Sequence, residues 1–321
     1  MIKRIIINII IVLNLFFISS ANSKTVYGSF FDESRKREVS YKVYYPDKMK
    51  GTCPIIIFSH GLGGSVESAE YLGEHLSQNG YVCFHVQHEG SDESIWKGAT
   101  TLKEAMKMLK ESLLNYKNAE NRFKDIPFVV DEIIKLNRSS DIFKGLLDTI
   151  NIGIIGHSYG ARSVLIAAGE KVVKGKYSLK EPRIKVGIAL SPKLPENPPI
   201  DLNTIYEDIN IPLFHITGTE DRDPLERDSK FSPKDRTIPY QNITNSQQYL
   251  LVLYKAVHMT FSAGKKLSND DPYYDEHIES VKKGVTAFLN FYLKNNESDG
   301  AWLKNDFKNT LDSKDTFEWK K

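Results

Sequence analysis

The chain has 321 residues, 40% of them hydrophobic, so it can bury the core of one large domain or two small ones. Its 43 lysines and arginines nearly balance its 41 aspartates and glutamates. A near-neutral charge gives no support for a nucleic-acid partner or for electrostatic capture by an anionic membrane.

The first 23 residues predict a signal peptide. Lys3 and Arg4 precede an apolar run over residues 5–18, and small residues that suit cleavage follow at positions 19–23. Because the run is short for a spanning helix, we expect an exported protein, periplasmic or secreted, with no membrane span after cleavage. An uncleaved N-terminal anchor is the alternative interpretation.

The chain has two cysteines, Cys53 and Cys83, at the start of one predicted strand and within the next. Export would permit a disulfide between them. We favour two separate buried thiols, which is the commoner state of cysteines in buried strands.

Residues 25–45 predict a β-hairpin, because strand-forming residues flank a charged turn at 32–37 and alternate strictly with polar ones after it. A continuous apolar run at 54–59 then predicts a parallel strand that is buried on both faces. This strand runs directly into the glycine-rich turn His60-Gly61-Leu62-Gly63-Gly64.

The glycine-rich turn does not fit a phosphate-binding loop. A dinucleotide fingerprint would need glycine where Val66 stands, and a Walker loop would need a lysine. Acyl-transfer enzymes place at such a turn a backbone N–H that is free to bind the oxyanion of the reacting carbonyl. We therefore predict the amide of Leu62 as one oxyanion donor, with a plain strand-to-helix turn as the alternative.

A helix at about 68–78 and a buried strand at 80–86 are predicted next. Residues 94–122 then form a polar insertion whose apolar residues recur at spacings of three and four, which predicts amphipathic helix. This insertion is either a lid over the site or a peripheral helix, and the sequence does not choose between them. A further amphipathic helix begins at Phe123.

Residues 151–162 have the pattern of a nucleophile elbow. A β-branched run ends in Gly156-His157-Ser158-Tyr159-Gly160 and passes into apolar residues at helical spacing. In such a strand-turn-helix unit the serine hydroxyl projects away from the end of the sheet. The two glycines have no Cβ, which leaves room where the backbones of the strand and the helix approach each other. The pattern predicts Ser158 as the nucleophile and the amide of Tyr159 as the second oxyanion donor.

Three more strands are predicted at 184–190, 211–217 and 248–254, with a proline-rich loop at 192–199. A helix at 274–294 closes the fold, and a charged tail follows at 295–321. Strands that alternate with helices indicate one α/β domain over residues 24–294. We expect a mostly parallel eight-stranded sheet with helices on both faces and an antiparallel N-terminal hairpin.

In such a sheet the catalytic residues gather at the carboxyl ends of the strands, so we expect the acid and the base there. Among the eight histidines, His258 follows the last strand and is predicted as the general base, with His88 in reserve. Asp221 and Asp223 both follow the strand at 211–217. We predict Asp221 as the orienting acid, because the turn that begins at Gly218 keeps it nearer the strand end, and Asp223 as the alternative acid. Two weaker candidates are Glu220 and Asp208.

With these residues in hand the chain resembles the α/β hydrolase superfamily. The branch it is most similar to holds platelet-activating-factor acetylhydrolases, chlorophyllases and dienelactone-hydrolase-like esterases. Segments 58–64, 156–160, 218–221 and 258–261 carry the resemblance, which covers about residues 26–293. In the acetylhydrolase-like branch the Leu62 and Tyr159 amides would match the oxyanion donors. Serine at the elbow departs from the cysteine of true dienelactone hydrolases, and the 94–122 insertion and the tail have no counterpart.

We expect a secreted serine carboxylic-ester hydrolase that works through an acyl-enzyme on short-chain esters of small molecules or lipids. The alternatives are a lipase, phospholipase or polyesterase, and, from another class, a non-catalytic binding protein on a hydrolase scaffold. We expect no cofactor and no metal, because His88-Glu89 and the group Asp271, Asp275 and His277 lack a recognised ligand spacing. The sequence does not define protein partners or oligomeric state.

Overall fold

The structure is a computed structural model that describes residues 22–172, 177–193, 201–225, 232–262 and 272–321. The apolar run of the predicted signal peptide and most of the proline-rich loop, residues 194–199, lie outside the described residues. In the part of the chain that is described, no helix is both long enough and apolar enough to cross a bilayer.

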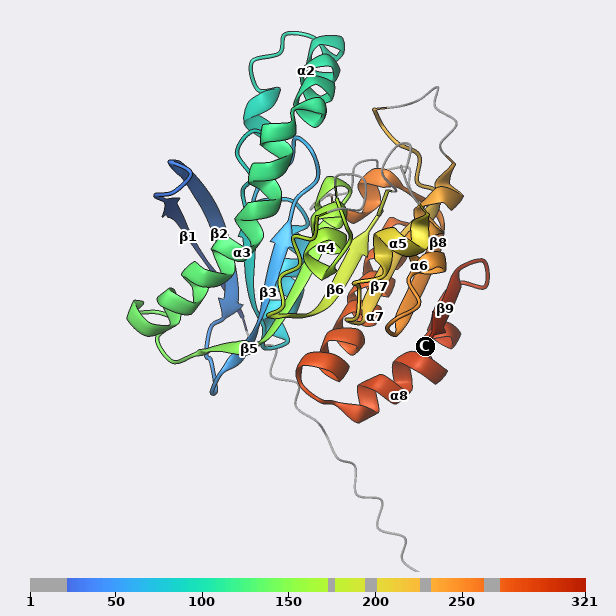
Figure 1. Ribbon diagram of the computed structural model, residues 1–321. Coiled ribbons are helices and arrows are strands. Elements are labelled where there is room, and N and C mark those ends of the chain that lie inside the picture. Colours follow the sequence, from blue (N-terminus) through green and yellow to red (C-terminus); the bar gives the residue numbers. More distant parts are fainter. Residues whose placement is uncertain (1–21, 173–176, 194–200, 226–231, 263–271) are drawn as a thin grey trace, which may run out of the picture.

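One nine-stranded sheet organises the molecule, in the order β1-β2-β4-β3-β5-β6-β7-β8-β9 (Figure 1). The core strands β3 to β8 pair in parallel, whereas β1, β2 and β9 pair antiparallel with their neighbours. The strands are β1 Ser23–Asp32, β2 Arg37–Pro46, β3 Cys53–Ser59, β4 Val82–Val86, β5 Leu147–His157, β6 Ile184–Leu190, β7 Leu213–Glu220, β8 Gln248–Val257 and β9 Thr316–Lys320. The predicted fold class, a mostly parallel sheet with an antiparallel N-terminal hairpin, is confirmed.

The prediction of eight strands was one short. The ninth, β9, lies in the segment predicted as a charged tail, and it pairs with residues 248–252 of β8. Its alternation is readable, since Phe317 is buried between exposed neighbours, but five residues among lysines and aspartates gave too short a pattern to separate from a polar tail.

Helices cover both faces of the sheet and bury two hydrophobic clusters. Side chains of α1, α7 and α8 pack into one cluster, and side chains of α3, α4 and α5 pack into the other. The fully apolar strand β3 contributes to both, as a strand buried on two sides must. The helices are α1 Glu70–Gln78, α2 Leu102–Leu114, α3 Tyr116–Ser139, α4 Tyr159–Ala168, α5 Leu202–Tyr206, α6 Ile238–Asn242, α7 Tyr274–Leu293 and α8 Glu297–Asn305.

The predicted insertion forms α2 and the first turns of α3, which project beyond one end of the sheet (Figure 1). Its predicted limit at Arg122 was wrong, because that residue lies inside α3. The helix begins earlier, where the Asn115 side chain accepts hydrogen bonds from the amides of Lys117 and Asn118. Asn115 is the single residue between α2 and α3, so the boundary between the two helices lies at 115 and not at 122.

Cys53 and Cys83 are both buried and both free. They lie on the neighbouring parallel strands β3 and β4, where Cys83 pairs with Ile56 and not with Cys53. The expected pair of separate thiols is what the structure contains.

Candidate active site

Ser158 lies at a strained turn between β5 and α4. Its backbone has φ 56° and ψ −113°, a region that residues with a Cβ rarely adopt. The amide of Ser158 donates to the carbonyl of Leu190 at 2.9 Å, which fastens the turn to β6. Strain of this kind persists only where the surroundings fix the backbone, and it concentrates at functional sites.

Two glycines make the turn sterically feasible. A Cβ on Gly156 would lie 2.2 Å from the carbonyl oxygen of Gly160, so strand and helix touch as the elbow pattern predicts. A Cβ on Gly160 would lie 1.8 Å from the carbonyl oxygen of Ser59, at the end of β3. The second glycine therefore also brings the elbow against the strand that leads into the glycine-rich turn.

The structure brings Ser158, His258 and Asp221 together. The hydroxyl of Ser158 is 2.9 Å from Nε2 of His258, and Nδ1 of His258 is 2.8 Å from Oδ1 of Asp221. His258 follows β8 in a short 3-10 helix over His258–Phe261. His157, the residue before the nucleophile in the elbow, contacts the backbone carbonyl of His258 through Nε2 at 2.9 Å. Burial keeps the pKa of His157 far below its usual range, so its neutral ring can donate this bond.

Asp221 is fully buried and surrounded by donors. Besides His258, its carboxylate accepts from Ser191 Oγ at 2.6 Å and Thr217 Oγ1 at 2.8 Å, and Arg236 Nε lies 2.7 Å from Oδ1. Burial alone would raise the pKa of this carboxyl, but the charges and hydrogen bonds of His258 and Arg236 outweigh it and hold the pKa below its ordinary value. Asp221 is thus an anion placed where an imidazolium would be stabilised.

The alternative acid Asp223 has other partners. Its carboxylate pairs with Lys193 Nζ at 2.9 Å and accepts from the amide of Leu225 at 2.8 Å. Among the described contacts, the carboxylate that hydrogen-bonds His258 belongs to Asp221 and not to Asp223.

The two predicted oxyanion amides are both unoccupied. Among the described residues, neither the Leu62 N–H nor the Tyr159 N–H has a hydrogen-bond partner. The carbonyl of Gly61, in the same peptide unit as the Leu62 N–H, accepts from His60 Nδ1 at 2.6 Å and from the Gly64 amide at 3.0 Å. Bonds to a carbonyl polarise its peptide unit, so the Leu62 N–H becomes the better donor.

A second Ser–His–Asp chain lies behind this turn, built on the reserve base His88. Nε2 of His88 is 3.0 Å from Ser59 Oγ, and Nδ1 is 3.0 Å from Asp125 Oδ2. All three residues are fully buried. Burial holds the pKa of His88 well below its ordinary value, and the charges of Arg122 and Arg37 act in the same direction.

Charged residues of α3, of β2 and of the turn before β2 complete this buried network. Asp125 pairs with Arg35 at 2.8 Å and with Arg37 at 3.2 Å. Burial raises the pKa of Asp125 to about 6, although both arginines oppose the shift. Arg122 donates to Ser59 Oγ at 3.0 Å and to the carbonyl of His60.

Sequence reasoning missed the roles of Arg122 and Asp125, although a signal existed. They continue, at helical spacing, the buried face of α3 that its apolar residues define. A charged residue on the buried face of a helix needs a partner in the core. The buried residues of α3 are Arg122, Asp125, Ile126, Val129, Val130 and Ile133.

The insertion contacts the glycine-rich turn. Trp96 Nε1 donates to the carbonyl of Gly63 at 2.7 Å, and a Cβ on Gly63 would lie 2.6 Å from Leu109 Cδ2. Trp96 and Leu109 therefore place apolar surface one residue from Leu62. Movement of α2 as a lid stays a prediction.

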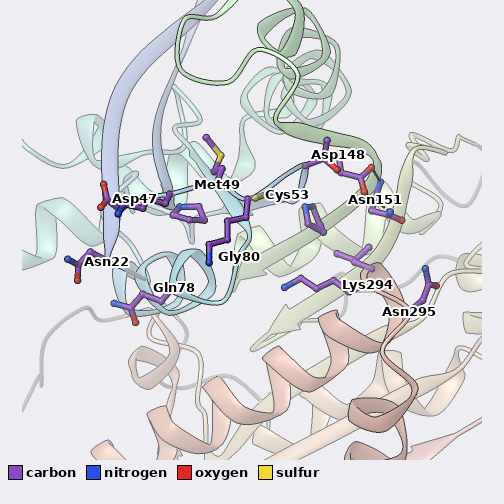
Figure 2. Close-up of a pocket in the computed structure, with 16 residues that line it drawn as sticks. Asn22, Asp47, Met49, Cys53, Gln78, Gly80, Asp148, Asn151, Lys294 and Asn295 are labelled. Carbon is purple, nitrogen blue, oxygen red and sulfur yellow. Dashed lines mark hydrogen bonds between the residues drawn. The ribbon is translucent and has the colours of Figure 1, made fainter. Parts of the chain in front are cut away.

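A hollow of about 890 Å³ lies at the opposite ends of the strands (Figure 2). Cys53, Asp148, Asn151 and Lys294 are among its lining residues, next to the first residues of β3 and β5. None of the predicted site residues lines it. Over the described ranges, no group of three or more histidine, cysteine or acidic side chains is arranged to hold a metal ion.

The parallel sheet, its two helical layers and the sharp turn at Ser158 are those of an α/β-hydrolase fold. Within that class the chain is similar to the platelet-activating factor acetylhydrolases, as the motifs led us to expect. Residues 23–126 match the family model described as platelet-activating factor acetylhydrolase, isoform II. This stretch contains the glycine-rich turn and Arg122, and it ends before the elbow.

Two curated relatives extend the similarity. The platelet-activating factor acetylhydrolase of Cavia porcellus is 25% identical over 312 residues, which cover 87% of this chain and 65% of the relative. The enzyme of the same name from Canis lupus familiaris is 25% identical over 190 residues, which cover 51% of this chain and 40% of the relative. The matches thus span 65% and 40% of the lengths of these two relatives.

Proposed function

We propose that the protein is an exported serine carboxylic-ester hydrolase that works through an acyl-enzyme. The observation that carries the proposal is the unbroken chain of hydrogen bonds from Asp221 through His258 to Ser158, beside two backbone amides that have no partner among the described residues. Nucleophile, base, orienting acid and oxyanion donors are the parts that acyl transfer requires. Export rests on the pattern of residues 1–23 alone.

The geometry supports the following steps. His258 takes the hydroxyl proton of Ser158 as Oγ attacks the ester carbonyl, and the Leu62 and Tyr159 amides bind the oxyanion. Asp221 stabilises the imidazolium, which then gives its proton to the leaving alcohol as the ester C–O bond breaks. Water, deprotonated by His258, attacks the acyl-enzyme, and the carboxylic acid leaves as Ser158 regains its proton.

Short-chain acyl esters are the proposed substrates. Trp96 and Leu109 close the space beside Gly63, next to the proposed oxyanion site. The names of the two relatives point to the acetyl ester group of platelet-activating factor. This lipid is therefore the first lipid substrate to test. A lipase, phospholipase or polyesterase remains the alternative, and a rate that rises with acyl length or at an oil-water interface would favour it.

The proposal is tested by labelling the protein with a fluorophosphonate probe and by measuring hydrolysis of p-nitrophenyl esters from acetate to palmitate. We expect labelling and hydrolysis in the wild type, fastest with acetate, and neither in Ser158→Ala. Ser139→Ala, at the exposed end of α3, is the matched control and should label normally. A folded Ser158→Ala protein that still hydrolyses acetate would refute the proposal. A wild type that neither labels nor hydrolyses any ester would favour the non-catalytic binding protein.

A further inference from the structure

Arg122 joins the two backbone segments that carry the proposed oxyanion amides. On one side its Nη2 donates to Ser59 Oγ at 3.0 Å and to the carbonyl of His60, two residues before Leu62. On the other side its Nε donates to Ser163 Oγ on α4 at 3.1 Å. One rigid guanidinium therefore spans from the end of β3 to the helix that begins at Tyr159.

Two further contacts strengthen this link. Arg122 Nη1 donates to Ser91 Oγ at 2.8 Å, and the carbonyl of Ser91 accepts from the amide of Gly63 at 2.9 Å. The guanidinium carbon lies 4.6 Å from the centre of the Tyr159 ring, within the range of a cation–π contact. Arg122 thus contacts the ring of Tyr159 directly, and it reaches the glycine-rich turn through its partner Ser91.

The charge of Arg122 is buried and, among the described residues, forms no ion pair, although the charges of Asp125 and Asp92 reach it. The side chain is fully buried, and within the described part of the chain no carboxylate lies at ion-pair distance from it. Burial lowers the pKa of Arg122 to about 10, which leaves it protonated at neutral pH. A buried cation that is not neutralised by a direct ion pair favours further negative charge in its neighbourhood, and its effect is larger there than in water.

We propose that Arg122 is a positioning residue for the oxyanion hole. It holds the Leu62 turn at a fixed distance from the Tyr159 end of α4, and it leaves a positive charge behind the place where the substrate oxygen becomes negative. This inference rests on the proposed function and assigns a role to a residue of the insertion, outside the three side chains of the triad. It predicts that Arg122 acts on the transition state more than on substrate binding.

The test compares Arg122→Gln, Arg122→Lys and Ile133→Val with the wild type, using p-nitrophenyl acetate. We expect kcat of Arg122→Gln to fall about 10²- to 10³-fold with KM nearly unchanged, as when a single oxyanion donor is lost. Lysine keeps the charge but not the fork of donors, so Arg122→Lys should recover part of the loss. The rate of fluorophosphonate labelling should fall in parallel with kcat.

Ile133→Val is the matched control, because Ile133 is buried on the same face of α3 but is not a partner of either turn. It should lower the denaturation midpoint and leave kcat near the wild-type value. If Arg122→Gln does not fold, Ser163→Ala removes the bond from Arg122 to α4, together with the longer bond of 3.4 Å from Ser163 Oγ to the carbonyl of Tyr159, and should lower kcat several-fold with KM unchanged.

Three results would overturn the inference: a kcat of Arg122→Gln equal to that of Ile133→Val, a KM that rises while kcat is kept, or no recovery by lysine. For Ser163→Ala, an unchanged kcat would do the same. A folded Ser158→Ala protein that keeps its activity would instead refute the proposed function, so the two failures are distinguishable.

Discussion

The protein contains two Ser–His–Asp chains of nearly equal geometry. In Ser158–His258–Asp221 the two bonds measure 2.9 and 2.8 Å, and in Ser59–His88–Asp125 both measure 3.0 Å. The surroundings differ. Ser158 is partly exposed on a strained turn, beside two amides without a partner in the described part of the chain, whereas Ser59 is fully buried and its Oγ already accepts a bond from Arg122.

The electrostatics of the two chains differ in the same way. The pKa of Asp221 is held low by His258 and Arg236, while the pKa of Asp125 is raised by burial despite two arginines. The comparison teaches that hydrogen-bond distances alone do not mark a catalytic serine. Access to the hydroxyl and nearby backbone N–H groups that could bind an oxyanion are needed as well, and among the described residues these two features meet at Ser158, the proposed nucleophile.

The largest expected difference between the two chains is in their histidines. His258→Gln should lower kcat by about 10⁶, because it removes the base and leaves only the oxyanion site. His88→Gln should keep kcat within about tenfold and cost roughly 1–3 kcal/mol of stability, since it leaves buried polar groups unpaired. Steady-state hydrolysis and urea unfolding of both variants provide the measurement. Equal losses of kcat would contradict the distinction.

The two aspartates should differ next. Asp221→Asn should lower kcat by about 10⁴, because it removes the charge that stabilises the imidazolium and fixes its tautomer. Asp125→Asn leaves Arg35 and Arg37 without their shared carboxylate and should cost about 3–5 kcal/mol of unfolding free energy. Hydrolysis rates and denaturant midpoints separate these effects. A large loss of kcat in a stably folded Asp125→Asn protein would show that the second chain takes part in the chemistry.

The close backbone contact between the elbow of Ser158 and the end of β3 at Ser59 can be broken at Gly160. Gly160→Ala would place a methyl group 1.8 Å from the carbonyl oxygen of Ser59 and should cost about 3 kcal/mol or more. Gly98→Ala is the control, since its Cβ would have no neighbour within 4 Å. Thermal unfolding of the two variants checks this, and a Gly160→Ala protein as stable as the control would show that the elbow can move away from β3.

The smallest expected effect is on the pH dependence of stability. Because the pKa of native His88 is far below 6.5, the unfolded chain binds a proton below pH 6.5 that the native protein does not. His88 therefore lowers the free energy of unfolding by about 1.4 kcal/mol for each pH unit below 6.5. Asp125 acts in the opposite sense, because burial raises its pKa to about 6. Its contribution to the free energy of unfolding is fully present below about pH 4 and is lost as the pH rises through 6.

His88→Gln isolates the histidine contribution. We expect its free energy of unfolding to fall less steeply than that of the wild type between pH 7 and 5. Below pH 6.5 the difference in slope should be about 1.4 kcal/mol per pH unit. Parallel curves for the two proteins would show that His88 is protonated in the folded state.

Much of the fold and the place of the site followed from local patterns. The elbow around Ser158 and the strand ends before Asp221 and His258 are local features, so periodicity and turn chemistry predicted where they lie. The roles of these residues stay predictions. What could not be predicted depends on tertiary contacts. Arg122 was predicted at the end of the insertion and Asp125 in the amphipathic helix after it, yet both have partners at or just after the end of β3 or β4. The donors to Asp221 from Ser191 and Arg236 likewise come from segments 30 and 15 residues away in sequence.

The last strand of the chain has a consequence for any shortened version of the protein. β9 occupies the outer margin of β8 along residues 248–252. A chain that stops at the end of α7 would leave N–H and C=O groups of β8 without their β9 partners along residues 248–252. Such a margin is a template for a strand of another molecule, so the shortened protein should self-associate even though every proposed catalytic group is still present.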